Sequence, residues 1–499
     1  MSEKSSRPES PGAPPATGFF GHPAGLSTLF FTELWERFSY YGMRAILILF
    51  MTASKATGGL GLDVVTAGAV YGMYTSGVYM LSLPGGWLAD RILGQRKTVF
   101  LGGSLIAAGQ FLLALPLPWT FYLGLVVIVF GTGMLKPNAS TIVGKLYQPG
   151  DQRRDAGFSI FYMGINTGAF ISPLIVGWVG QRINWHWGFA LAGVGMLVGL
   201  AQYTLGAKRM GDAGLYPVAP RDAAEAARQK RFLVAGALAL AGLAIVIGAL
   251  ALAGVLTPVR IADLFGVLLL VTVAGSFGSM IFSPGWTPVE RKRIIVTFVM
   301  FLAASLFWSE FEQAGSTLNL FADRSTRNEI LGFSFPASWM QSVQALFIII
   351  FAPVFAWLWL KLGRRDPSSP VKFSLGLLFV GASFALMSVA AVLAGTGTRV
   401  SPLWLTATYL LHTFGELCLS PVGLSAMTKL APARVAGLVM GMWFLSNATG
   451  NYLGGRLASF YESFPLPHLF GLVAAMGVAA GLVMFALTPL IRKLMGGVK

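Results

Sequence analysis

Runs of about 20 or more mainly apolar residues recur along nearly the whole chain, and they constrain its fold more than any other feature. A helix of about 20 residues is long enough to cross a hydrocarbon core about 30 Å thick. Soluble proteins average roughly a quarter charged residues, whereas here only 11% are charged and 55% are hydrophobic. The sequence therefore predicts an all-α integral membrane protein with fourteen transmembrane helices, near residues 29–51, 65–89, 98–117, 119–143, 156–180, 186–206, 232–256, 261–282, 294–322, 336–361, 373–395, 402–429, 435–458 and 468–491.

The basic residues are distributed unevenly over the predicted loops. The net charge of +16 could indicate nucleic-acid binding, but with both termini on one side of the fourteen spans, that side carries 26 of the 36 Lys and Arg residues and the other side only seven. Cytoplasmic loops of membrane proteins are enriched in Lys and Arg. We therefore predict a multi-pass protein of the cell (inner) membrane, with both termini in the cytoplasm, the lipid bilayer around it and no nucleic-acid partner.

One long polar segment, 207–231, divides the spans and is predicted to be a cytoplasmic linker. Six spans precede it and form a predicted N-terminal six-helix bundle over 29–206. Two nearly featureless spans follow within 232–293, which we interpret as an inserted helix pair with its loop, and six more form a predicted C-terminal six-helix bundle over 294–499. Residues 1–28 open with a stretch rich in Ser, Pro and Glu, so they are predicted to be a disordered cytoplasmic tail.

A charged loop follows the second span and is echoed in the second half. The segment 90–97 reads DRILGQRK, and 361–365 reads KLGRR after the second span of the later half. The first loop, preceded by GGWLA, resembles a loop motif of the major facilitator superfamily, whose two six-helix halves surround a central site. This resemblance implies a major facilitator fold with two extra helices inserted between the halves.

A stripe of charged and aromatic residues runs along the first span. At about 100° per residue its members fall within an arc of about 140°, and most of the remaining surface is apolar. Charges at the centre of a spanning helix cost roughly 2.5 to 3.5 kcal/mol each, so they are usually confined to ion or substrate pathways. The stripe is therefore predicted to face protein and to be functional; it consists of Glu33, Glu36, Arg37, Tyr40, Tyr41 and Arg44.

Further polar side chains interrupt later spans. Lys136 lies several residues inside the fourth span, beside Pro137, and such interruptions are tolerated beside a cavity; snorkelling to the interface is the alternative. In the ninth span, Glu310 lies about 200° from Glu312 around the helix, so the two cannot line one narrow face. We expect Glu310 to have a structural role, with a partner elsewhere in the protein. A polar face flanked by Trp308 is predicted in the ninth span, formed by Ser309, Glu312, Gln313, Ser316 and Asn319.

The last polar anomalies lie in the fifth, twelfth and thirteenth spans. Glu416 shares a helical face with His412, and Asn166 and Trp443 lie inside their spans. An isolated Asn in a membrane helix more often forms a hydrogen bond between helices than binds a ligand. For Trp308 and Trp443, packing between helices is an alternative to a role in the substrate pocket.

The charges predicted to be central do not balance. Four acids, Glu33, Glu36, Glu312 and Glu416, face Arg37 and Lys136, and their unpaired insertion would sum to roughly 15 to 21 kcal/mol. They must pair, hydrate or protonate, which leads to proton coupling as a hypothesis. The four histidines are scattered and the one cysteine lies in a span, so no metal site and no cofactor other than the coupling proton is predicted.

The residues of the first span also match a known family. The segment 33–42, ELWERFSYYG, resembles the ExxERFxYYG signature of the proton-dependent oligopeptide transporters (POT or PTR family). Further similarities are FYMGINTG at 161–168, KPN at 136–138, FEQ at 311–313 and GELCLSP at 415–421. The resemblance implies a bacterial symporter that imports di- and tripeptides with protons.

The resemblance also implies roles for individual residues. Arg37 and Lys136 would attract the peptide carboxylate, and Glu416 with Asn166 would receive its amino group. Glu312 would pair alternately with Lys136 or Arg44 as gates exchange, while Glu33 and Glu36, with Glu312, would couple proton occupancy to that exchange. Side-chain pockets would be shaped by Tyr40, Tyr41, Tyr79, Trp308 and Trp443. The sequence departs from many relatives at Gln344–Ala345 and at Asn447, which leaves the pocket contacts there open.

Other functions are weighed against this one. A proton-coupled transporter of another small solute, such as nitrate or a metabolite, would keep Glu33, Glu36 and Arg37, but a nitrate site would not need the acid Glu416. A membrane enzyme would need a metal or nucleophile constellation, and none appears in the sequence. A passive channel would conduct peptides regardless of the proton gradient. The sequence does not indicate the oligomeric state.

Overall fold

The computed structural model describes residues 18–148 and 150–497. The prediction of disorder for the first seventeen residues lies outside this range. Sixteen α-helices are present in the described chain: α1 (Gly25–Thr52), α2 (Val64–Met80), α3 (Ser82–Leu88), α4 (Gln95–Leu113), α5 (Pro118–Lys145), α6 (Arg154–Trp178), α7 (Trp185–Leu205), α8 (Ala223–Leu252), α9 (Pro258–Phe282), α10 (Pro288–Phe311), α11 (Thr317–Arg324), α12 (Met340–Leu362), α13 (Ser369–Ala394), α14 (Leu403–Leu430), α15 (Ala436–Ala458) and α16 (Leu466–Leu494).

Two predicted spans are each built from two of these helices. The second span is α2 followed by α3, and the ninth is α10, a short 3-10 turn (Glu312–Gly315) and α11. Joining these pairs gives the fourteen predicted spans. Over residues 18–148 and 150–497 the strands are limited to an antiparallel pair in the α11–α12 connection, β1 (Glu329–Ile330) and β2 (Phe333–Ser334).

Three segment boundaries differ from those predicted. Helix α1 begins at Gly25, inside the predicted tail, and α8 begins at Ala223, inside the predicted linker. Helix α10 begins at Pro288, six residues before the predicted start of the C-terminal bundle. Polar or charged residues in the first turns of α8 and α10 lowered their apolar character, and hydropathy therefore placed both starts too late.

Side-chain caps explain where several helices begin. The Asp63 carboxylate accepts hydrogen bonds from Thr66 N at 2.8 Å and Thr66 Oγ1 at 2.9 Å, and these bonds lower the pKa of Asp63. Before α10, Thr287 and Glu290 form a reciprocal capping box, with Pro288 as the first helical residue. These short polar connections set the ends of long apolar helices.

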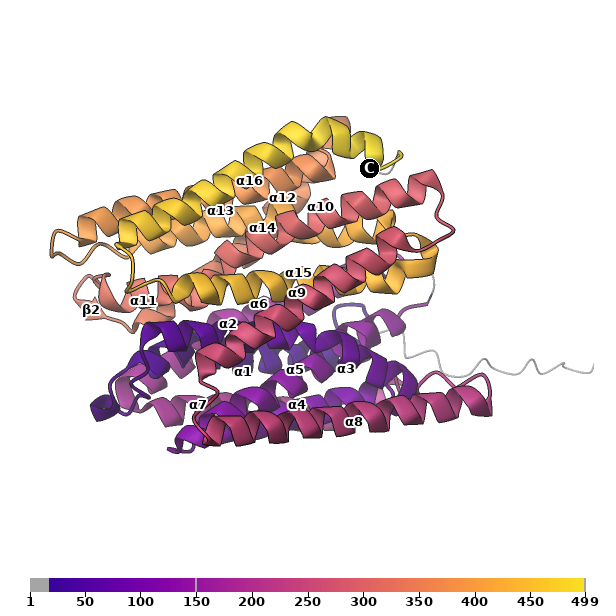
Figure 1. The fold of residues 1–499 in the computed structure, drawn as a ribbon, viewed down its shortest axis with the longest axis horizontal. Coiled ribbons are helices and arrows are strands. Elements are labelled where there is room, and N and C mark those ends of the chain that lie inside the picture. The colour runs from indigo at the N-terminus through magenta and orange to yellow at the C-terminus, as the bar shows by residue number, and fades with distance from the viewer. Residues whose placement is uncertain (1–17, 149, 498–499) are drawn as a thin grey trace, which may run out of the picture.

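The helices form two layers of opposite chain halves. Figure 1 shows α1–α7 in indigo to magenta-purple on one side and α10–α16 in rose-red to yellow on the other. Helix α2 packs against α15 across the boundary, and α9 packs against α2, α10 and α15. Helix α8 runs along the outside of the first half and contains no buried residue.

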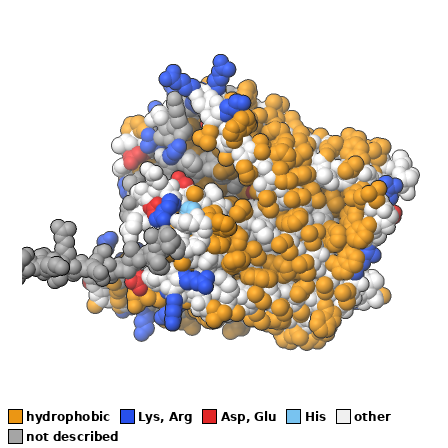
Figure 2. Space-filling view, turned by 180° about the vertical axis from the view of Figure 1, so that it is seen from behind, with side chains coloured by type: hydrophobic (Ala, Val, Ile, Leu, Met, Phe, Trp, Pro, Cys, Tyr) orange, Lys and Arg blue, Asp and Glu red, His pale blue; other side chains and the backbone are white. Residues whose placement is uncertain are grey.

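The surface fits a membrane environment. Nine helical segments of the described chain are long and apolar enough to cross a membrane. Helices α1, α2, α4, α14 and α15 are not among them; four of these five, α1, α2, α14 and α15, carry residues of the predicted site. Figure 2 shows a broad apolar surface, with Lys and Arg side chains gathered mainly at one end of the molecule, on the left of this view.

Hydrogen bonds between the two halves cluster at the opposite end of the molecule. Asn319 Nδ2 donates to the Ala45 carbonyl at 2.8 Å, and Ser459 Oγ donates to the Val65 carbonyl at 3.1 Å. The backbone N–H of Ser338 donates to Gln181 Oε1 at 3.0 Å. The halves are therefore sealed at the end away from the basic surface.

Candidate functional site

The charged stripe of α1 is buried in protein, as its position in the sequence predicted. The Arg37 guanidinium forms ion pairs with Glu33, at 3.1 Å between Nε and Oε1, and with Glu36. These three residues and Arg44 are each no more than 5% exposed. Gly168 of α6 permits this burial, since a Cβ there would lie 3.0 Å from the Arg37 Cβ. Arg37 is thus held between two carboxylates on its own helix.

Arg44 links the two halves of the molecule. Its NH2 group lies 2.7 Å from Glu312 Oε2 and donates to the Glu312 carbonyl oxygen at 3.3 Å. Its Nε donates to the Tyr71 hydroxyl at 2.7 Å. Both charged partners are nearly fully buried. The pairing of Arg44 with Glu312, one of the two partners that the family resemblance implied for Glu312, is therefore present in this conformation.

The prediction that the polar residues of the ninth span share one face of a continuous helix is wrong, because the helix is broken in this span. Helix α10 ends at Phe311, and the backbone of Ser316 leaves the helical region, with φ −124° and ψ −90°. Gly315 lies in the break, where a Cβ would come within 2.6 Å of Arg44 Nε. The close approach of Arg44 and Tyr71 requires glycine here, and the break places the Glu312 carbonyl within reach of Arg44.

Lys136 lies near the α1 stripe. Helix α5 continues through Pro137, and the Lys136 ammonium sits over the Tyr79 ring at 3.9 Å from its centroid. It interacts electrostatically with Arg37, Glu33, Glu36 and Glu312. Within the described residues Lys136 forms no ion pair. It is a cation stacked on an aromatic face, which stabilises the charge without neutralising it.

Glu416 provides a carboxylate from the second half. It is half-buried on α14, its Oε2 has no hydrogen-bond partner in the described chain, and it interacts electrostatically with Glu312. Asn166 lies on α6, and its Nδ2 donates to the carbonyl of Tyr162 on its own helix at 3.0 Å. The structure therefore places Asn166 one turn from Tyr162, and no hydrogen bond joins it to Glu416 within the described residues.

The predicted aromatic wall is only partly assembled around these charges. Tyr40 and Tyr41 contact each other with ring centroids 5.2 Å apart, and the Arg37 and Arg44 guanidinium groups lie 5.3 and 5.8 Å from the Tyr40 and Tyr41 centroids, respectively. Trp308 and Trp443 are buried at 6% and 5% exposure.

The two tryptophans have packing partners that explain their burial. Trp308 packs on Phe307 and Phe311 with ring centroids 5.2 Å apart in each pair. Trp443 packs against Gly423 of α14, and its carbonyl accepts a hydrogen bond from Asn447 Nδ2 at 3.1 Å. Packing is thus a visible role for both residues, and a pocket role remains a prediction.

The sequence analysis missed three tyrosines. Tyr71 binds Arg44, Tyr74 interacts electrostatically with Tyr40 and Glu36, and Tyr162 interacts with Glu416, Glu33 and Arg37. The two residues of α2 are three positions apart and share a helical face. That spacing, in a span already known to contain Tyr79, was the signal that could have found them.

Comparisons with known proteins agree with this arrangement. A model of the POT family matches residues 96–475. The chain belongs to the POT family. It is 45% identical over 486 residues to the "Uncharacterized transporter YclF" of Bacillus subtilis, with 97% of each chain covered. It is 42% identical over 490 residues to the "Peptide transporter YePEPT" of Yersinia enterocolitica, with 96% of each chain covered.

A solved structure gives the same result for the fold. The crystal structure of a peptide transporter POT in complex with sulfate is 46% identical, covers 97% of this chain and 98% of its own, and has a TM-score of 0.92. These findings confirm the family resemblance and the predicted fold class.

Within the described residues no group of three His, Cys, Asp or Glu side chains could hold a metal ion.

Proposed function

We propose that this POT family member imports di- and tripeptides together with protons by alternating access, and that it is not an enzyme. One observation carries the proposal: Lys136 of the first half and Glu416 of the second half each lack an ion pair among the described residues. An unpaired charge at membrane depth costs several kcal/mol. A zwitterionic peptide would bring its carboxylate to Lys136 and its amino group to Glu416, so it would neutralise both.

Proton coupling follows from the pairing of Arg37. Two carboxylates, Glu33 and Glu36, contact the Nε of Arg37, and their negative charges weaken its attraction for a peptide carboxylate. A proton on this glutamate pair would remove one negative charge and leave Arg37 available to the substrate. Peptide binding would then favour the protonated pair, and the two would be coupled by linkage.

The gate is assigned to the pair of Arg44 and Glu312. The ion pair joins the halves at their sealed end, with Tyr71 as an additional partner. Opening that end requires the pair to separate. Glu312 would then be free to pair with Lys136, with which it already interacts electrostatically. We place this sealed end outside the cell, with both termini in the cytoplasm of a cell (inner) membrane, because the basic residues gather at the other end.

Uptake into proteoliposomes tests the proposal. Dialanine or trialanine should accumulate against its gradient only when a pH or voltage gradient is imposed, because a potential of 100 mV supplies roughly 2.3 kcal/mol per proton. A protonophore should abolish accumulation. Accumulation that persists with the protonophore would contradict proton symport, and absence of peptide uptake in a folded preparation would contradict the substrate.

Two variants test the zwitterion site. Lys136→Gln and Glu416→Gln should each raise the KM for dialanine about tenfold or more, which corresponds to about 1.4 kcal/mol. N-acetyl-dialanine, which lacks the positive charge, should distinguish them: Lys136→Gln should weaken its binding and Glu416→Gln should not. Lys55→Gln, in an exposed 3-10 turn, is the matched control. Equal effects of both variants on both compounds would contradict the assignment.

A further inference from the structure

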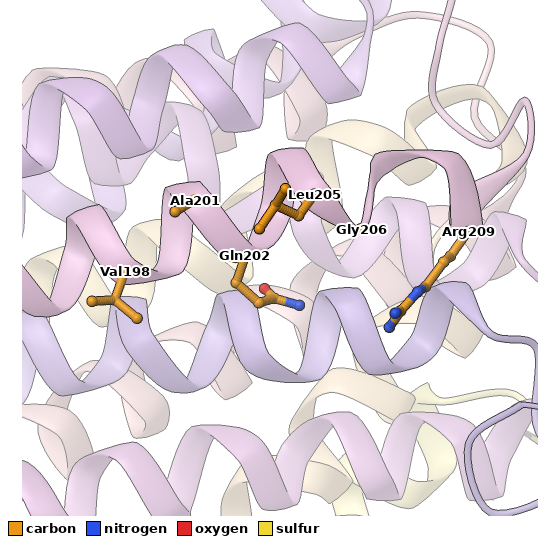
Figure 3. A pocket seen from close by; sticks show the side chains of 6 residues that line it. All are labelled: Val198, Ala201, Gln202, Leu205, Gly206 and Arg209. Carbon is orange, nitrogen blue, oxygen red and sulfur yellow. The ribbon is translucent and has the colours of Figure 1, made fainter.

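A groove opens on the outer surface of the first half, where α7 ends. It has a volume of about 400 Å³ and is lined by Val198, Ala201, Gln202, Leu205, Gly206 and Arg209 (Figure 3). Most of these residues recur at intervals of three or four along α7 and the turn that follows it, so they lie on one helical face. That face is on the surface, since the side chains of Val198 and Leu205 are 42% and 84% exposed.

The groove follows the seam between α7 and α1. The Thr28 hydroxyl donates to the Gly206 carbonyl at 3.2 Å, and the Thr32 hydroxyl donates to Gln202 Oε1 at 3.3 Å. Figure 3 shows Gln202 and Arg209 pointing to the same side, toward the neighbouring helix. With the amide oxygen bound to Thr32, the Gln202 NH2 group is available as a donor inside the groove.

The lining changes from apolar to cationic along its length. Val198, Ala201 and Leu205 form the apolar part, and Arg209 closes it at the end where α1 begins. At about 1.5 Å per residue, Val198 and Leu205 are about 10 Å apart along α7, and Arg209 lies one turn further on, in the 3-10 turn Ala207–Met210. Half of a hydrocarbon core about 30 Å thick is about 15 Å. The whole groove, from Val198 to Arg209, therefore spans about the depth of one leaflet, with the guanidinium at headgroup level.

Arg209 has no side-chain partner in the part of the chain that the structure describes. Its side chain is exposed and forms neither a hydrogen bond nor an ion pair there. Arginine readily binds phosphate through two parallel hydrogen bonds. The groove thus combines an unneutralised phosphate-binding group with an apolar stretch of about 10 Å that part of an acyl chain could cover.

We infer that this groove is a binding site for one anionic phospholipid. An acyl chain would lie along Val198, Ala201 and Leu205, the phosphate would bind Arg209, and Gln202 would donate to a polar oxygen of the lipid. Basic pockets between spanning helices on the cytoplasmic side bind anionic headgroups in this manner. Free phosphate would leave the apolar part unfilled, so the lipid is the occupant that satisfies both ends.

Native mass spectrometry of the purified full chain tests the inference. Phosphatidylglycerol and phosphatidylcholine with the same acyl chains are titrated onto the delipidated protein. Phosphatidylglycerol should bind more tightly, and Arg209→Gln should weaken it about fivefold, as expected for about 1 kcal/mol per basic side chain. Ala201→Trp, which fills the apolar part and keeps the charge, should also weaken it.

Lys208→Gln is the matched control because Lys208 is an exposed neighbouring cation that does not line the groove. It should leave phosphatidylglycerol binding unchanged. The inference would be overturned by equal binding of the two lipids, by equal effects of Lys208→Gln and Arg209→Gln, by displacement of the lipid with inorganic phosphate, or by a dimer whose formation depends on Ala201. Peptide uptake is not the readout, so this result is independent of the proposed function.

Discussion

Two glutamates separated by one residue meet opposite environments. Glu312 pairs with Arg44 at 2.7 Å, whereas Glu310 is fully buried and neither of its oxygens has a hydrogen-bond partner in the described chain. Glu310 instead faces α16, where a Cβ at Gly477 would lie 2.8 Å from Glu310 Oε1. The structural partner expected for Glu310 is therefore not found among the described residues, and its carboxyl group contributes a desolvation penalty without a compensating bond.

The variant Glu310→Met should accordingly stabilise the protein. Replacing an unsatisfied buried polar group by an apolar one of similar length removes a penalty of about 1 to 3 kcal/mol. The melting temperature in detergent should rise by a few degrees, and peptide uptake should be retained. Glu312→Met is the contrasting control. It leaves the buried Arg44 charge without its ion-pair partner, which lowers the free energy of unfolding by about 3 to 5 kcal/mol, so the melting temperature of this variant should fall. A fall for Glu310→Met as well would show that Glu310 has a favourable partner.

At the scale of elements, the contact between α2 and α15 is made by glycines. A Cβ on Gly72 would lie 2.9 Å from the Gly455 Cα, and a Cβ on Gly68 would lie 2.8 Å from the Gly455 carbonyl oxygen. These helices come from different halves and close together near the sealed end. Their backbones can approach this closely because neither helix carries a side chain at the contact.

Gly455→Ala should therefore impair closure of this end. An added methyl group costs about 1 to 3 kcal/mol when neighbouring backbone cannot move, and this cost applies only to the state in which α2 and α15 touch. The initial rate of peptide uptake should fall about tenfold. Gly437→Ala, in the same helix, would place a Cβ that has no atom within 4 Å apart from its own stretch of helix backbone, and it should leave the rate unchanged. Equal rates for both variants would contradict a role for this contact in transport.

The positions of the helices could be predicted from the sequence, but the break in the ninth span and the contacts between helices could not. Apolar length is a local property, so all fourteen spans were found, and the conflict between charge and span in α1 identified the stripe around Arg37. The break at Gly315 depends on contacts with α1 and α2, which lie more than 240 residues away in the chain, and no local pattern indicates it. The pairing of Arg44 with Glu312 could be predicted only from the family resemblance. Helical spacing predicts which face of a helix a residue lies on, but it does not predict which residue of another helix it contacts.

The whole molecule has two chemically different ends, and the function depends on which of them faces the cytoplasm. The sealed end also contains the α13–α14 connection, where Val400 exchanges backbone hydrogen bonds of 2.8 and 2.9 Å with Arg327 and Ser325. The basic end contains the start of α8. If the basic end is cytoplasmic, this conformation is closed to the outside, and a peptide at Lys136 and Glu416 would reach the site from within the cell.

Cysteine labelling determines this orientation directly. In a Cys418→Ser background, which removes the one native cysteine, Thr398→Cys places a thiol on the sealed end and Lys230→Cys places one on the basic end; both positions are exposed. A membrane-impermeant maleimide should label Thr398→Cys in right-side-out spheroplasts and Lys230→Cys only after lysis. The reverse pattern would put the closed Arg44–Glu312 gate on the cytoplasmic side, so the same structure would represent the state that accepts peptide from outside.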